Sequence, residues 1–129
     1  MNFKPHRLFG LLCLFVGLAL FGSVGCGHNP APPPPLAEAE IPAQMQKAFA
    51  TAQPELKEAV SRLTSALQAK DYPAAYQAVQ ALCNLPGQTG EQRTLAARAL
   101  LTITGRLQAA QAQGDREAAD ALRLRQTSR

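Results

Sequence analysis

The side chains best suited to nucleophilic or metal chemistry in this sequence are three cysteines and two histidines. Both histidines, His6 and His28, lie before residue 30, and none follows. Serine and cysteine nucleophiles of the usual kind need a histidine base, and a zinc ion needs several thiolate or imidazole ligands. The later part of the chain lacks both sets, so we predict no catalytic residues, no metal site and no cofactor.

Paired carboxylates are the remaining candidates for acid–base chemistry. Glu55 lies near Glu58, and Asp115 lies near Glu117. Each pair falls at the start of an expected helix, where the helix dipole stabilises negative charge. No glycine-rich loop follows a strand, so the signature of nucleotide binding is absent. Helix capping accounts for the carboxylates, and we expect no enzyme activity.

The charge pattern argues against nucleic acid as a partner. The formal net charge of +4 includes Lys4 and Arg7 near the N-terminus, and the rest of the chain is nearly balanced. A nucleic-acid binder usually shows a dense basic face. Tyr72 and Tyr76 are four residues apart, which indicates packing on one helix face in preference to a ligand platform. We therefore predict no nucleic acid and no small-molecule ligand.

The N-terminus has the three parts of an export signal. Residues 1–7 carry Lys4 and Arg7 without an acidic residue, residues 8–21 are apolar and uncharged, and small residues follow. This order is typical of a secretory signal peptide. One alternative is an ordinary cleaved signal. Another is an uncleaved anchor, because residues 8–25 are barely long enough to cross about 30 Å of hydrocarbon.

Cys26 follows Val24 and Gly25 directly, which makes the signal more specific. The stretch resembles the lipobox of bacterial lipoproteins, over residues 1–26. The resemblance implies that the thiol of Cys26 receives a diacylglycerol and that a dedicated peptidase cuts the bond between Gly25 and Cys26. It also implies acylation of the new amino group. Ser23 stands where that family usually has leucine.

The residue after Cys26 is Gly27. In the best-known sorting rule of the lipoprotein family, aspartate at this position retains a protein in the inner membrane. We therefore expect the bacterial cell envelope, with the periplasmic side of the outer membrane favoured over the inner membrane. Cys13 is expected to leave with the signal. Cys83 is expected to pack as a small apolar residue, with a free thiol as the alternative.

A proline-rich stretch follows, and residues 27–35 read GHNPAPPPP. Proline clusters exclude helices and inner strands and favour an extended polyproline II spacer. We interpret this stretch as a tether that holds a domain away from the bilayer. A ligand for a proline-recognition module is the alternative, although flanking charge is lacking. His28 lies in the tether and is expected to be exposed to solvent.

Beyond the tether, apolar residues recur with a helical period and no segment alternates like a strand. The fold class is therefore all-α, a small antiparallel helical-hairpin bundle after a signal helix and a Pro-rich tether. Caps and breakers predict helices on both sides of Pro54, between Asp71 and Pro86, from Thr89 to about Gln113, and after Asp115. The expected regions are a signal peptide (1–25), the acylated cysteine and tether (26–40), a helical domain (41–126) and a tail (127–129).

One helix also resembles a known repeat. The segment KDYPAAYQAVQALCNLP is similar to the second helix of a tetratricopeptide repeat, with Asp71 and Tyr72 at its start and Ala75 at the small packing position. The first-helix signature is absent, and Leu82 stands where that family has a small residue. A second stretch in which two alanines follow an aspartate after two residues, Asp-x-x-Ala-Ala, begins at Asp115. The resemblance implies tetratricopeptide-like hairpins and does not establish a repeat array.

These observations predict a lipid-tethered, non-enzymatic interaction module that binds another envelope protein. The long helix after Thr89 supports this interpretation, because it is apolar on two faces, with Leu95 and Ile103 on one and Leu101 on the other. One alternative is a structural envelope lipoprotein that associates with itself. Another is a single-pass membrane-anchored protein without lipid.

Overall fold

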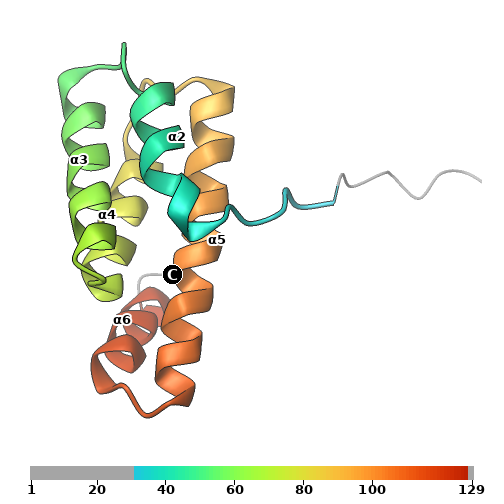
Figure 1. Cartoon of the computed structure of the whole chain (residues 1–129), viewed down its shortest axis with the longest axis vertical. Coiled ribbons are helices and arrows are strands. Elements are labelled where there is room, and N and C mark those ends of the chain that lie inside the picture. The colour runs from blue at the N-terminus through green and yellow to red at the C-terminus, as the bar shows by residue number, and fades with distance from the viewer. Residues whose placement is uncertain (1–30, 128–129) are drawn as a thin grey trace, which may run out of the picture. The chain divides into compact units, whose positions relative to one another are not determined.

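The computed structural model describes residues 31–127, and Pro33–Arg129 is one compact unit. Residues 33–40, the C-terminal part of the expected tether, belong to this unit. Among the described residues, no helix is both long enough and apolar enough to cross a bilayer. The elements are a short 3-10 helix η1 (Glu38–Glu40) and the α-helices α2 (Ile41–Ala48), α3 (Pro54–Gln68), α4 (Tyr72–Asn84), α5 (Gly90–Ala112) and α6 (Arg116–Thr127), as Figure 1 shows.

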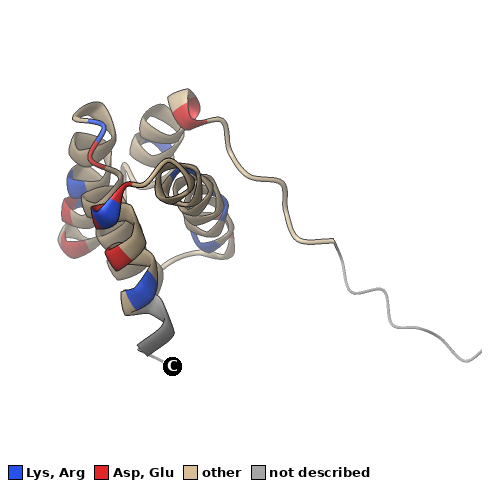
Figure 2. Ribbon diagram, turned by 90° about the horizontal axis from the view of Figure 1, so that it is seen from below, with Lys and Arg blue, Asp and Glu red and all other residues tan. Residues whose placement is uncertain are grey.

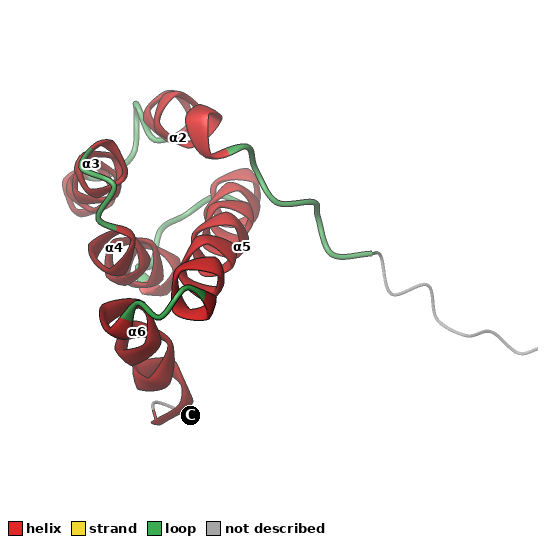
Figure 3. Cartoon of the chain, turned by 60° about the horizontal axis from the view of Figure 1, so that its bottom comes forward, coloured by secondary structure: helices red, strands yellow, loops and turns green. Residues whose placement is uncertain are grey.

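The all-α prediction is confirmed for the described part of the chain. Helices α3 and α4 form an antiparallel hairpin, α4 packs on α5, and α5 turns back into α6. Helix α2 contacts both α3 and α5, and α6 also reaches α4. Figure 3 shows α2, α3, α4 and α5 around a common centre, with α6 beside α4 and α5. The long helix α5 therefore connects the two ends of the bundle.

Capping residues begin three of the helices where the sequence predicts them. The Asp71 carboxylate accepts a hydrogen bond from the Ala74 amide at 3.0 Å, at the start of α4. Thr89 forms a capping box with a glutamine at the start of α5. Asp115 accepts hydrogen bonds from two amides of the first turn of α6. Each cap typically contributes about 1 kcal/mol.

The ends of α3 and α5 have the same backbone motif. At the end of α3 the Asp71 amide donates to the Ala66 carbonyl, and at the end of α5 the Asp115 amide donates to the Ala110 carbonyl. Each motif places one residue in the left-handed region, namely Lys70 with φ of 59° and Gly114 with φ of 90°. The similarity between the stretches that begin at Asp71 and Asp115 therefore corresponds to two equivalent helix ends.

The core is built largely from small and medium side chains. Three alanines with no exposed surface, Ala75, Ala96 and Ala99, lie on α4 and α5 and allow these helices to approach closely. The larger buried side chains include Phe49 and Tyr76, which are 1% and 2% exposed. Because alanine contributes little apolar area, the buried leucines and isoleucines, with Met45, Phe49 and Tyr76, supply most of the hydrophobic stabilisation.

Candidate functional site

Residues 31–37 form neither helix nor strand, η1 follows at Glu38, and this part of the chain contacts α5 at three points. We call residues 34–38 the docked segment. Arg98 Nε donates to the Pro34 carbonyl at 2.8 Å, the Thr102 hydroxyl donates to the Leu36 carbonyl, and Arg106 Nε lies 2.6 Å from the Glu38 carboxylate. Every second residue of the segment thus meets every fourth residue of the helix.

Arg98, Thr102 and Arg106 lie on one face of α5, since residues four apart are neighbours on a helix surface. The contacts with Pro34, Leu36 and Glu38 therefore come from three successive positions on that face.

Leu36 anchors the docked segment by its side chain. It is 4% exposed and belongs to the core cluster. Burying one leucine contributes about 1.5–3 kcal/mol, and ordering each residue that is not already restricted costs about 1–2 kcal/mol. The preceding prolines are restricted before docking, which lowers the cost. Ordering Leu36, Ala37 and Glu38 still costs more than the burial of Leu36 returns, so polar contacts are needed to keep the segment docked.

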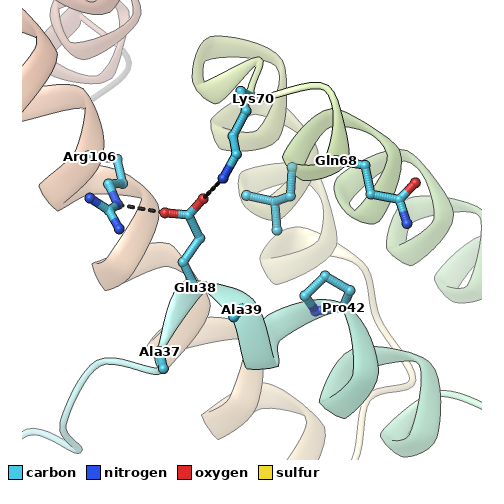
Figure 4. Close-up of a pocket in the computed structure, with 8 residues that line it drawn as sticks. Ala37, Glu38, Ala39, Pro42, Gln68, Lys70 and Arg106 are labelled. Carbon is cyan, nitrogen blue, oxygen red and sulfur yellow. Dashed lines mark hydrogen bonds and ion pairs between the residues drawn. The ribbon is translucent and has the colours of Figure 1, made fainter.

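Glu38 is the centre of those polar contacts (Figure 4). Its Oε1 atom accepts hydrogen bonds from Lys70 Nζ at 3.1 Å and from the Tyr72 hydroxyl at 3.0 Å, and its Oε2 atom pairs with Arg106. The Glu38 side chain is 12% exposed, whereas Lys70 and Arg106 are 70% and 55% exposed. One enclosed carboxylate is thus held by two cations that face solvent, from the α3 end and from α5.

These partners keep Glu38 ionised. Burial acts to raise the pKa of Glu38, but hydrogen bonds from Lys70 and Tyr72 and the charge of Arg106 outweigh it and lower the pKa. The hydrogen bond to Glu38 raises the pKa of Lys70 in turn. A carboxyl group with a lowered pKa stabilises the fold above its unfolded pKa, and this contribution disappears as the pH falls through the lowered value. At neutral pH it is fully present.

An open pocket of about 430 Å³ lies beside the cluster. It is bounded by η1, the start of α2, the end of α3 and α5, and Glu38, Lys70 and Arg106 form its polar side (Figure 4). The other lining residues are Ala37, Ala39, Pro42, Leu67 and Gln68. Because Glu38 is charged and already paired, the cluster is suited to recognition of a carboxylate rather than to proton transfer.

The predicted anchor residues Gly25 and Cys26 lie outside the described part of the chain. Cys83 packs against the core from α4, and burial raises the pKa of its thiol, so the thiol stays protonated at neutral pH. Glu58, one of the carboxylates considered above, pairs with Arg62 four residues later on the exposed side of α3. Tyr76 lies in the core, whereas Tyr72 is half-buried and bonds to Glu38.

The Glu38 cluster itself is not evident from the sequence. Glu38 lies in the stretch interpreted as tether, and its partners Lys70 and Arg106 are far from it along the chain. The sequence offers one local signal, since Lys70 precedes Asp71 in the same way that Gly114 precedes Asp115. The structure places both residues in the left-handed region, where glycine is usual. Basic and acidic residues are otherwise intermixed over several helices (Figure 2). Among the described residues no group of side chains could hold a metal ion.

Gln92 joins the start of α5 to the end of α2 and gives a testable prediction. Its Oε1 accepts from the Thr89 amide and its Nε2 donates to the Ala48 carbonyl, both at 2.9 Å. Gln92→Glu keeps the acceptor but places a carboxylate against that carbonyl. We expect a loss of about 1–3 kcal/mol in the free energy of unfolding at neutral pH, because a buried carbonyl loses its donor.

Denaturant titration followed by circular dichroism measures this loss. The loss should shrink below about pH 4, where a protonated carboxyl can donate again. The matched control is Gln77→Glu, on the exposed side of α4, which should change stability by less than about 0.5 kcal/mol. Equal losses for the two variants would show that the hydrogen bond from Gln92 to the Ala48 carbonyl contributes nothing to stability.

Comparison with models of known families, with curated proteins and with solved structures gave no match.

Proposed function

We propose that this chain is a lipid-anchored cell-envelope protein whose helical unit is a non-enzymatic interaction module. The observation that carries the proposal is that the segment after the expected anchor docks directly on α5, through Leu36 and Glu38. An anchor signal in residues 1–26 is thus followed by a short spacer and then by a folded unit that contacts the end of that spacer. This order suits a module held close to a membrane.

The side chains of the described part support a binding role. Its densest polar cluster is an ion-pair network in which Glu38 is satisfied by Lys70, Tyr72 and Arg106. Antiparallel hairpins such as α3–α4 and α5–α6, proposed here to be tetratricopeptide-like, present helix faces on which a partner can pack. The proposed location is the periplasmic side of the outer membrane in preference to the inner membrane, and the proposed partner is another envelope protein.

One observation favours self-association as a second candidate. Leu101 is 47% exposed, while Leu95 and Ile103 on the same helix are buried. Leu101 therefore lies on a different side of α5 from the two buried residues. A single exposed leucine is ordinary on a protein surface. It therefore makes self-association a second candidate, and binding to another envelope protein remains the first.

Sedimentation of the compact unit, residues 33–129, separates the two candidates. An interaction module should sediment as a monomer, and chemical crosslinking of the native chain in cells should join it to a different envelope protein. A structural, self-associating protein should instead sediment as an oligomer that Leu101→Ser dissociates. Recovery of only the monomer from cells, together with a monomeric unit in solution, would contradict both candidates.

A further inference from the structure

We propose that the face of α5 formed by Arg98, Thr102 and Arg106, completed by Lys70 and Tyr72, is a recognition site for an extended acidic peptide. Its resident ligand is the chain's own docked segment, which binds reversibly as a latch. The site consists of contacts already described and does not depend on the lipid. The effect of the latch on the distance between the helical unit and the membrane does rest on the proposed anchor.

The contacts define which peptide the site accepts. Arg98 and Thr102 bind backbone carbonyls, which selects an extended chain and not a particular side chain. Side chains are read at two positions, a buried leucine at Leu36 and a carboxylate at Glu38. The pattern is therefore an apolar residue two positions before an acid, preceded by prolines that hold the chain extended. A preformed extended ligand loses little entropy on binding.

The way the segment is held indicates that it can be released. Residues 31–35 are exposed, and among residues 31–40 Leu36 is the one deeply buried side chain. The two cations that hold Glu38 are more than half exposed, at 70% and 55%. Segments with few buried contacts and solvent-exposed polar contacts open more readily than the core. The latch can therefore open while α2–α6 remain folded.

Lys70 gives independent support for a binding role. It ends α3 in the left-handed conformation, with φ of 59°, where Gly114 ends α5 in the same motif. A non-glycine residue in this region carries backbone strain. Glycine would relieve that strain, but it would remove the ammonium group that contacts Glu38 at 3.1 Å. Lys70 thus gains a contact with Glu38 while it keeps a strained backbone conformation at the end of α3.

Docking would set how far the unit can stand from its anchor. Between Cys26 and the docked segment the chain has residues 27–33, which can reach at most about 25 Å when fully extended. After release, residues 27–40 are free and can reach at most about 50 Å. The latch would therefore hold the unit near the bilayer and allow it to reach farther when open.

The latch is tested with a glutamate-specific protease on the full chain in detergent. Cleavage after Glu38 needs a released segment, whereas cleavage after Glu91, in the first turn of α5, reports opening of the helices. We expect the ratio of the two rates to rise at least tenfold in Arg106→Ala and in Lys70→Gly. Lys70→Gly should fold because glycine suits its backbone conformation. The matched control Arg123→Ala, whose exposed pair with Asp120 is at 3.9 Å, should leave the ratio unchanged.

The recognition site is tested with a dye-labelled peptide of residues 31–40, followed by fluorescence anisotropy. The native chain should bind it weakly, because the tethered segment competes at high effective concentration. A Leu36→Ala, Glu38→Ala chain should bind it at least tenfold more tightly, and adding Arg106→Ala should remove that gain. A peptide with glutamine in place of Glu38 should bind at least tenfold more weakly.

Two results would overturn the proposal. One is an unchanged cleavage ratio in both Arg106→Ala and Lys70→Gly. The other is a native chain that sediments as a dimer and becomes a monomer in Arg106→Ala, which would place a second copy's segment in the site. Both measurements are made in detergent. Failure of the latch therefore leaves the anchor untouched, and absence of a lipid leaves the latch untouched.

Discussion

A chain carrying Cys26→Ser is expected to incorporate no labelled fatty acid in cells, whereas the native chain incorporates it. The reason is chemical, because the proposed thioether forms on the Cys26 sulfur and serine offers no thiol. The proposed cut before residue 26 depends on that lipid, so the variant should keep residues 1–25. Each buried methylene of an acyl chain contributes about 0.8 kcal/mol to membrane binding, so several chains on one residue hold firmly.

The chain supplies its own matched controls. Cys13→Ser and Cys83→Ser remove the other two thiols, and both variants should keep the label. The intact mass of the native chain separates the alternatives. A lipoprotein begins at Cys26 and carries acyl mass, a spanning anchor keeps residues 1–25 without it, and an ordinary secreted chain is cut without acylation. Label retained in Cys26→Ser would contradict the lipid anchor.

The helices were predictable because their ends are determined locally. Asp71, Thr89 and Asp115 each cap a helix through amides two or three residues away. Pro54 begins α3, and the pair at Pro86 and Gly87 follows the end of α4, whereas α2 ends at Ala48, earlier than the break expected near Pro54. Such signals need only a few neighbouring residues, and the structure confirms them.

The site was not predictable because it depends on packing. Glu38 meets Lys70 and Arg106 only after α5 lies beside the end of α3. Along the sequence, Arg98, Thr102 and Arg106 have the spacing of any solvent-facing helix side. The prolines before Leu36 indicate a spacer, and nothing in that pattern shows that its last residues enter the core. Long-range side-chain contacts require the positions of the helices, which periodicity alone does not supply.

Local helix signals and long-range side-chain contacts both determine how the helical unit is connected to its proposed anchor. Because η1 leads directly into α2, any force on the tether passes first to the Leu36 and Glu38 contacts and then to α2. The attachment of α2 to the bundle therefore decides whether the unit stays intact when the latch opens. Phe49, at the end of α2, is the residue that tests this attachment most directly.

Phe49→Ala is expected to lower the free energy of unfolding by about 3–5 kcal/mol, the usual cost of removing a buried phenyl ring. Phe49 is 1% exposed and belongs to the core cluster, and α2 contacts both α3 and α5. Domains of this size are typically stable by about 5–15 kcal/mol, so the variant should lose a large part of its stability. Denaturant titration followed by circular dichroism measures the change.

The matched variants separate ring volume from position. Phe49→Leu fills most of the same space and should cost less than Phe49→Ala, whereas Leu101→Ala, at an exposed site, should change stability by less than about 0.5 kcal/mol. A loss below about 1 kcal/mol for Phe49→Ala would mean that α2 contributes little to the bundle. In that case α2 would belong functionally to the tether, and opening of the latch would release α2 along with residues 34–38.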